Sequence, residues 1–223
     1  MTAPFFIHAM NSTNVTSIAS GRRDDWLARL ESAVSPLQEG VASLTITNFR
    51  VSDETVERPG RTAAVLVPVL DQPNPEVVLT RRAQHLNNHA GQISFPGGAA
   101  EKGDPSAVST ALREAHEEIG LEPGRVRPLG FLDRFDSVSD YRVLPVVGLV
   151  QAPVEWTLDP NEVEEVFTIP LDVVLEAERY ERHFAVRDGI RFMYHSLEWQ
   201  GHTIWGLTAA MLMNLQLRIS DAD

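Results

Sequence analysis

The chain has 223 residues, of which 43% are hydrophobic and 22% charged, so it can bury a sizeable core and has the composition of an ordinary globular protein. Its formal net charge of −12 argues against a nucleic-acid partner, because binding to a phosphate backbone depends on clustered lysine and arginine. The absence of cysteine excludes disulfides and a thiol nucleophile. Small phosphorylated substrates remain allowed, since a bound dication reverses the local field of an acidic site.

The first residues predict neither a secretory signal nor a membrane anchor. They contain a short apolar run but no basic residue before Arg22. No stretch of the chain reaches the roughly 20 apolar residues that a membrane-spanning helix needs. We therefore expect a cytoplasmic protein with no membrane partner. Residues 1–55 are predicted to form an N-terminal extension, loose at first and helical from Asp24 to about Leu37, and residues 56–223 the main domain.

The remaining chain alternates between strand-like and helical patterns. Runs rich in β-forming residues precede and follow a glycine-rich segment, and a helix is predicted directly after that segment. The strands are expected at residues 62–70, 77–81, 127–135, 143–150, 182–186, 192–198 and 203–205, and a final amphipathic helix at about 207–219. This order favours a fold of the α/β class.

The central helix has predicted ends and two different flanks. The sequence from Gly97 to Leu121 reads GGAAEKGDPSAVSTALREAHEEIGL. Asp104 followed by Pro105 predicts an N-cap and a first helical residue, and Gly120 can take the left-handed conformation that ends a helix. An apolar flank at helical spacing would face the core and consists of Ala111, Leu112, Ala115 and Ile119.

Three glutamates lie on another flank of this helix. Glu114, Glu117 and Glu118 are spaced i, i+3 and i+4, so their side chains converge. Carboxylates held that close repel one another unless an oxygen-seeking cation such as Mg²⁺ or Mn²⁺ lies among them. Arg113 stands four residues before Glu117 and is interpreted as an orienting residue. The alternative for the acidic residues alone is a helix face that only contacts water.

The segment resembles the Nudix box, G-x5-E-x7-R-E-U-x-E-E-x-G-U with U an apolar residue. The second half matches from Arg113 to Leu121. In the first half Asp104 replaces glutamate six residues after Gly98, and it stands nine rather than eight residues before Arg113. The resemblance implies an α/β/α sandwich with a mixed β-sheet and a catalytic loop-helix-loop. It also implies pyrophosphohydrolase activity that depends on Mg²⁺ or Mn²⁺.

The resemblance further implies roles for individual residues. Glu117 would act as a ligand or as a base, and the metal ligands together would be Glu114, Glu117, Glu118 and the backbone carbonyl of Gly98. Other Nudix enzymes take the general base from a later loop, where Glu162 is preferred here because it follows Asp159 and Pro160. Glu164 and Glu165 are alternatives, and a surface acid without a catalytic role is a further one.

Residues 78–98, VLTRRAQHLNNHAGQISFPGG, resemble the motif L-L-T-x-R-[SA]-x3-R-x3-G-x3-F-P-G-G of Nudix enzymes that cleave coenzyme A. Asn87 replaces the second arginine of the motif and so removes a charge that could meet the 3′-phosphate. Segments at residues 136–148, 161–171 and 204–212 also resemble bacterial CoA pyrophosphatases. The implied reaction gives 3′,5′-ADP and (acyl-)4′-phosphopantetheine. The alternatives are another nucleoside diphosphate derivative, such as ADP-ribose, NADH or an oxidised nucleotide, and a non-catalytic binding protein.

For the residues expected to contact the nucleotide substrate, the sequence also leaves other roles open. Arg81 and Arg82 alternate across a strand end, so at most one points into the cleft. His85 and His89 are spaced by four and could share a helical face near a phosphate, or simply lie at the surface. Phe95 either stacks on adenine or packs in the core. The substrate-binding prediction is Arg81, Arg82, His89 and Phe95. A homodimer is left open.

Overall fold

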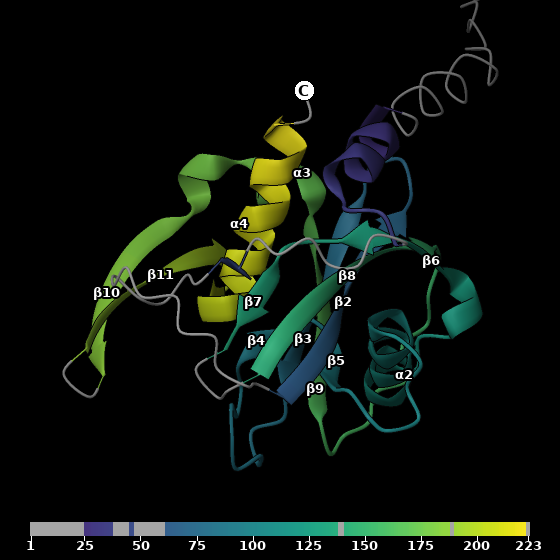
Figure 1. The fold of residues 1–223 in the computed structure, drawn as a ribbon, viewed down its shortest axis with the longest axis horizontal. Coiled ribbons are helices and arrows are strands. Elements are labelled where there is room, and N and C mark those ends of the chain that lie inside the picture. The colour runs from purple at the N-terminus through teal and green to yellow at the C-terminus, as the bar shows by residue number, and fades with distance from the viewer. Residues whose placement is uncertain (1–24, 38–44, 47–60, 138–140, 188–189, 222–223) are drawn as a thin grey trace, which may run out of the picture.

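The computed structural model describes residues 25–37, 45–46, 61–137, 141–187 and 190–221 (Figure 1). Within these residues, nine strands form the central sheet. They are β1 (Thr45–Ile46), β2 (Arg61–Asp71), β3 (Glu76–Arg82), β4 (Ile93–Ser94), β5 (Gly97–Ala99), β6 (Val126–Phe131), β7 (Arg134–Asp136), β8 (Tyr141–Gln151) and β9 (Val163–Pro170). A second sheet contains β10 (Glu181–Arg187), β11 (Ile190–Trp199) and β12 (His202–Trp205). The helices are residues 25–33, α2 (Ala107–Ile119), α3 (Leu171–Leu175) and α4 (Gly206–Asp221).

The central sheet is mixed, as predicted. Its main path runs β1-β7-β8-β2-β3-β4, with β5 paired to β2, β6 to β8 and β9 to β3. Strands β2 and β8 lie parallel over their whole lengths, from the Arg61–Tyr141 pair to the Asp71–Gln151 pair, whereas β3 is antiparallel to both β2 and β9. The long apolar runs of β2 and β8 are buried, as expected of strands covered on both faces.

Helices cover both faces of this sheet (Figure 1). On one face α2 packs through Ala111, Ala115 and Ile119, all fully buried. On the other face the core includes residues of α3, of α4 and of the helix at residues 25–33, among them Leu30 and Leu212. The arrangement is the α/β/α sandwich that the sequence predicts. Among the helices that the structure describes, none is both long and apolar enough to cross a bilayer.

Several predicted boundaries are wrong. The single strand expected at residues 127–135 is two strands, β6 and β7, because the chain leaves the strand conformation at Leu132 and Asp133. Strand β9 was not predicted, since two acidic residues interrupt its apolar pattern. The N-terminal helix ends at Ala33 rather than near Leu37, and its predicted start at Asp24 lies outside the described residues. Residues 1–22 and the boundary after residue 55 lie outside the described residues.

Candidate active site

Helix α2 begins two residues later than the sequence suggests. Its N-cap is Ser106, whose Oγ accepts a hydrogen bond from the backbone N–H of Ser109 at 3.2 Å. The prediction that Asp104 caps the helix and that Pro105 begins it is therefore wrong. The C-terminal prediction is confirmed, because Gly120 adopts the left-handed conformation with φ 68° and its N–H bonds the last turn.

Asp104 instead fixes the arginine of the Nudix box. Its carboxylate accepts hydrogen bonds from Arg113 Nε at 3.2 Å and from Arg113 Nη2 at 3.0 Å, and a third from Thr110 Oγ1 at 2.9 Å. Hydrogen bonding from Arg113 holds the pKa of Asp104 well below its usual range. This contact is not among the predicted ones, although the position of Asp104 in the box pattern is a signal for it.

Arg113 connects this anchor to the glutamates. Its Nη1 lies 3.0 Å from Glu114 Oε1 and donates to Glu117 Oε2 at 2.9 Å, and its Nη2 donates to the carbonyl of Ala99 at 3.1 Å. The predicted contact between Arg113 and Glu117 is confirmed. With Asp104 on one side and two glutamates on the other, the guanidinium has little freedom to rotate.

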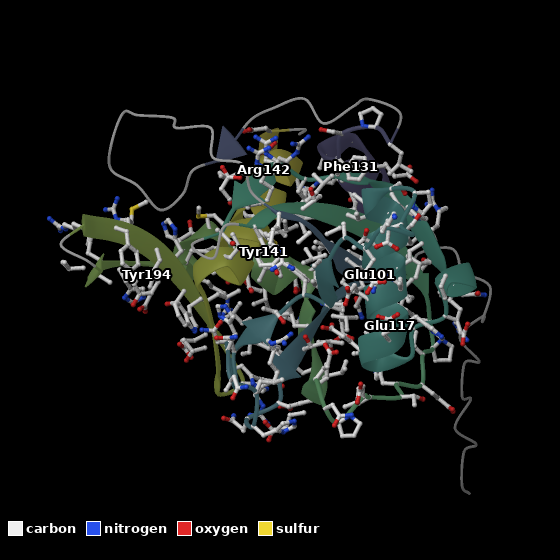
Figure 2. All side chains as sticks on the ribbon, turned by 60° about the horizontal axis from the view of Figure 1, so that its bottom comes forward. Glu101, Glu117, Phe131, Tyr141, Arg142 and Tyr194 are labelled. Atoms are coloured by element: carbon white, nitrogen blue, oxygen red, sulfur yellow. The ribbon has the colours of Figure 1, made fainter. Side chains whose placement is uncertain are left out.

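The three glutamates of α2 differ strongly in exposure. The side chain of Glu118 is 3% exposed and that of Glu114 14%. The side chain of Glu117, labelled on α2 in Figure 2, is 58% exposed. Glu118 and Glu114 therefore line a buried site, and Glu117 lies at its rim. The alternative of a helix face that only contacts water therefore does not apply to Glu114 and Glu118.

Glu118 has fewer donors than a buried carboxylate needs. It accepts one hydrogen bond from the N–H of Gly97 at 3.1 Å, and Arg82 Nη1 lies 3.6 Å from its other oxygen. Burial raises the pKa of Glu118 to about 8, and the charges of Glu162 and Glu114 add to the effect. The site thus favours a proton or another positive charge at this carboxylate.

Glu114 packs directly against the glycine turn before α2. A Cβ placed on Gly98 would lie 2.6 Å from the Glu114 carboxyl, so only glycine allows this approach. Burial raises the pKa of Glu114, Arg113 opposes that shift, and the charges of Glu117 and Glu162 add to it. The backbone of Gly98 can therefore lie against the Glu114 carboxylate, because Gly98 has no side chain between them.

These groups have the chemistry of a site for a hard divalent cation. Carboxylate and carbonyl oxygens are the ligands that such cations prefer, and burial, which raises the pKa of Glu114 and of Glu118, favours a cation beside these carboxylates. No three acidic or histidine side chains within the described part of the chain converge as a finished ligand set. The contacts of Arg113 with Glu114 and Glu117 account for this, because they direct both carboxylates toward the guanidinium.

The turn that carries Glu162 is tied to both α2 and β3. Its carbonyl accepts a hydrogen bond from the N–H of Ala83 at 2.9 Å, and the N–H of Asp159 in the same turn donates to the carbonyl of Glu118 at 3.0 Å. Glu162 is close enough to raise the pKa values of Glu114 and Glu118. The prediction that it lies in a loop is confirmed.

The two arginines at the end of β3 point in opposite directions, as predicted. Arg82 faces Glu118, whereas Arg81 pairs with Glu165 at 2.8 Å and lies 3.7 Å from Glu164. The two acids considered as alternatives to Glu162 are therefore engaged with Arg81 on the other side of the strand. Only one of the predicted arginines is adjacent to the buried glutamates.

The structure separates two of the alternatives left open for the substrate side. Residues 83–92 form turns rather than a helix, so His85 and His89 share no helical face. His89 has a positive φ of 58° and its ring Nδ1 lies 2.7 Å from Gln92 Oε1, which indicates a local role in the turn. Phe95 is only 3% exposed and packs in the core, so it does not stack on a base.

A hollow of about 430 Å³ borders the same loops. Its walls combine apolar surface with one acidic and one imidazole side chain, and are formed by Ala83, Gln84, His85, Leu158, Pro160, Val163 and Glu164. Pro160 and Val163, which flank the turn of Glu162, and Ala83, which follows Arg82, thus line a space large enough for part of a nucleotide derivative.

Comparison with known proteins identifies the family. The NUDIX domain model matches residues 60–188. The chain is 44% identical over 179 residues to the uncharacterized Nudix hydrolase NudL of Pectobacterium atrosepticum, covering 79% of this chain and 93% of that protein. The corresponding protein of Yersinia pestis is 43% identical over 160 residues, with coverages of 72% and 80%.

Solved structures give a more distant likeness. DR0079 from Deinococcus radiodurans superposes with a TM-score of 0.47 at 15% identity, covering 74% of this chain and 88% of that one. The assignment rests on the domain match and on the two sequence relatives, which extend over most of the described elements. The chain belongs to the Nudix hydrolase family, and it is a pyrophosphohydrolase of nucleoside diphosphate derivatives.

Proposed function

We propose that this protein hydrolyses the pyrophosphate bond of coenzyme A or acyl-CoA, giving 3′,5′-ADP and (acyl-)4′-phosphopantetheine. The observation that carries this proposal is the path of residues 78–98, the segment that resembles the CoA motif. It brings Arg82 to 3.6 Å from Glu118 and supplies the Gly97 N–H that Glu118 accepts. The segment that would recognise the substrate and the glutamates that would act on it therefore form one site.

We propose Mg²⁺ or Mn²⁺ as the metal. Its ligands would be Glu114, Glu118 and the carbonyl of Gly98, with Glu117 joining from the rim. When bound, a divalent cation polarises phosphoryl oxygens and lowers the pKa of a water molecule. The raised pKa values of Glu114 and Glu118 support this assignment, because a cation would offset the burial that causes them.

Side chains of the protein would perform the other steps of the hydrolysis. Glu162 accepts a proton from the attacking water, whose oxygen forms a bond to one phosphorus atom while the bond from that atom to the bridging oxygen breaks. The leaving phosphate departs with the bridging oxygen. Arg82 faces the negative charge that accumulates on the diphosphate. Arg113 keeps Glu114 and Glu117 oriented through its own anchor on Asp104.

The contacts of residues 78–98 also predict how much the 3′-phosphate of CoA contributes to kcat/KM. Asn87 supplies no charge, and Arg81 is already engaged with Glu165. His89 lies 2.7 Å from Gln92 within its own turn. We therefore expect removal of the 3′-phosphate to change kcat/KM by less than about tenfold, because no free arginine in this segment is dedicated to that group.

A substrate panel tests the proposal. The pure protein is incubated with Mg²⁺ or Mn²⁺ and equal concentrations of CoA, 3′-dephospho-CoA, acetyl-CoA, ADP-ribose, NADH and an oxidised nucleoside triphosphate, and the products are identified by mass spectrometry. We expect the CoA compounds to have the highest kcat/KM. Preference for ADP-ribose or NADH would replace the CoA assignment, and no turnover of any compound would favour a binding protein.

A variant tests the proposed base separately. Glu162→Gln should lower kcat about 100-fold and remove the acidic limb of the pH–rate profile. Glu155→Gln is the matched control, because Glu155 is exposed in the segment that leads to the same turn and does not line the hollow. If the two variants had the same turnover and the same profile, Glu162 would not be the base.

A further inference from the structure

The hollow that Ala83 and Val163 line lies directly beside the residues proposed to act on the diphosphate. Its volume of about 430 Å³ is in the range of small-molecule sites, roughly 300–1,000 Å³. Arg82 and Val163 are opposite partners in β3 and β9, and the N–H of Ala83 donates to the carbonyl of Glu162 at 2.9 Å. A group attached to a phosphate between Arg82 and Glu162 therefore begins about one residue away from this space.

The walls of this hollow are mostly apolar and include no lysine or arginine. Four of the seven lining residues are apolar, and the other three are Gln84, His85 and Glu164. Arg81 does not line the hollow, and its guanidinium lies 2.8 Å from Glu165 and 3.7 Å from Glu164. A phosphate group in this space would contact no arginine, and the Glu164 carboxylate would repel it.

The diphosphate of CoA joins two halves that differ in charge. The adenosine half carries the 3′-phosphate, which is an anion. The pantetheine half is uncharged, and its amide groups alternate with methylene and methyl groups. Burying a charge without a partner is far more costly than burying an amide that finds a hydrogen bond. The walls of the hollow therefore suit the pantetheine half and disfavour the adenosine half.

On the basis of the proposed CoA activity, we propose that this hollow binds the pantetheine arm, with any acyl group extending from its thiol end. Leu158 and Pro160 contact the methylene and methyl groups of the arm. The Gln84 side chain offers both a donor and an acceptor to an amide of the arm. Gly91, with φ 67°, leaves room for that side chain, because a Cβ on Gly91 would lie 2.5 Å from Gln84 Nε2.

A second hollow near the site has different walls. Its volume is about 480 Å³, and it shares only Leu158 with the first. Its walls carry three carboxylates and one imidazole, those of Glu117, Glu122, Asp159 and His116. The arm would find less apolar surface among these acids. Of the two hollows, the first is therefore the better match for an uncharged chain with methyl groups.

Inhibition by the two products tests which half occupies the hollow. Gln84→Trp places a larger side chain on its wall, so the KM of CoA and the inhibition constant of 4′-phosphopantetheine should each rise at least about tenfold. The inhibition constant of 3′,5′-ADP should change by less than about twofold. Gln151→Trp is the matched control, because Gln151 is exposed at the end of β8 and does not line the hollow. A weaker inhibition by 3′,5′-ADP instead, or no difference between the variants, would overturn the assignment.

A charge at the same position gives a second test. Gln84→Lys adds a cation that would attract a 3′-phosphate in the hollow. With the pantetheine arm there, the ratio of kcat/KM for CoA to that for 3′-dephospho-CoA should stay within about threefold of the wild-type ratio. A larger rise would show that the adenosine half occupies the hollow. Circular dichroism verifies that the variants are folded, and the lysine variant decides alone if Gln84→Trp is not.

The same measurements separate this inference from the proposed function. A wild-type protein that hydrolyses ADP-ribose but not CoA would overturn the proposed function, and the pantetheine assignment with it. If CoA is hydrolysed but Gln84→Trp and Gln151→Trp have equal KM values, the proposed function stands and only the assignment of the hollow is overturned.

Discussion

Two buried acidic groups in this protein have opposite surroundings. Asp133, 9% exposed, accepts hydrogen bonds from Asn214 Nδ2 at 2.6 Å and from Arg218 Nη1 at 2.8 Å. Glu118, 3% exposed, has one backbone donor and an arginine at 3.6 Å. The first carboxylate is satisfied within the protein, whereas the second is left short of positive charge. A structural acid and a ligand-binding acid are thus distinguished by their partners, since burial alone does not separate them.

The Asp133 cluster also joins distant parts of the chain. Arg218 of α4 donates to the carbonyl of Ala33 and to Ser35 Oγ, at 2.5 and 2.9 Å, as well as to Asp133. It thereby fastens the helix at residues 25–33 to the C-terminal helix. These contacts give the buried carboxylate of Asp133 partners within the protein, as buried polar groups require.

The largest expected effect is on catalysis at Glu118. Glu118→Gln keeps the size of the side chain but removes the charge that would balance a cation, so turnover should fall about 1000-fold. Hydrolysis of the best substrate of the panel at saturating Mg²⁺ measures the effect. Glu198→Gln, at an exposed position of β11, should leave turnover unchanged. Near-normal turnover of Glu118→Gln would remove it from the proposed ligands.

Arg218→Met should destabilise the fold without affecting the chemistry. Removing the arginine leaves Asp133 buried with one donor fewer, so the free energy of unfolding should fall by roughly 2–3 kcal/mol. The control is Arg127→Met, which breaks an ion pair with Glu31 of the same 2.8 Å length between exposed side chains. That variant should change stability by less than about 1 kcal/mol. Urea denaturation compares them, and equal losses would contradict the distinction.

The third effect is the pH dependence of stability in metal-free protein. The folded-state pKa of Glu118, about 8, lies above its ordinary value of 4.5. Its contribution to stability is therefore fully present below pH 4.5 and is lost as the pH rises toward 8. Gln at this position cannot ionise. In EDTA at pH 8, Glu118→Gln should have a higher Tm than wild type, and most of this difference should be lost at pH 5. An equal Tm at both pH values would contradict the raised pKa.

The sequence predicts local features of this protein better than its distant contacts. Helical periodicity identifies the buried flank of α2, and Gly120 marks its end, because both depend on residues within one turn. The N-cap was assigned to Asp104 because Asp-Pro is a strong local signal. The structure uses that carboxylate for Arg113, nine residues away, and Ser106 takes the cap instead. A contact at that spacing has no helical pattern to reveal it.

Contacts between distant residues leave no periodic signal. Asp133 and Arg218 are 85 residues apart, so their pairing depends on how α4 packs. The burial of Phe95 depends on the same packing. For the candidate site, the box pattern predicts which residues gather around α2, whereas their unequal exposure follows from the position of the helix against β5 and the turn at Glu162. Roles can be inferred from a pattern, but donors and burial require the fold.

The smallest expected effect concerns Asp104, which acts on the site only through Arg113. Asp104→Asn removes the charge that anchors the guanidinium but keeps an oxygen that can accept one hydrogen bond, so kcat should fall about tenfold with little change in KM. In an Arg113→Ala background the same substitution should have almost no further effect, because the residue through which it acts is gone. Steady-state kinetics of the four proteins gives the coupling. If the two substitutions lowered kcat independently, Asp104 would have a separate role, and the anchor would not be the reason for its place in the box.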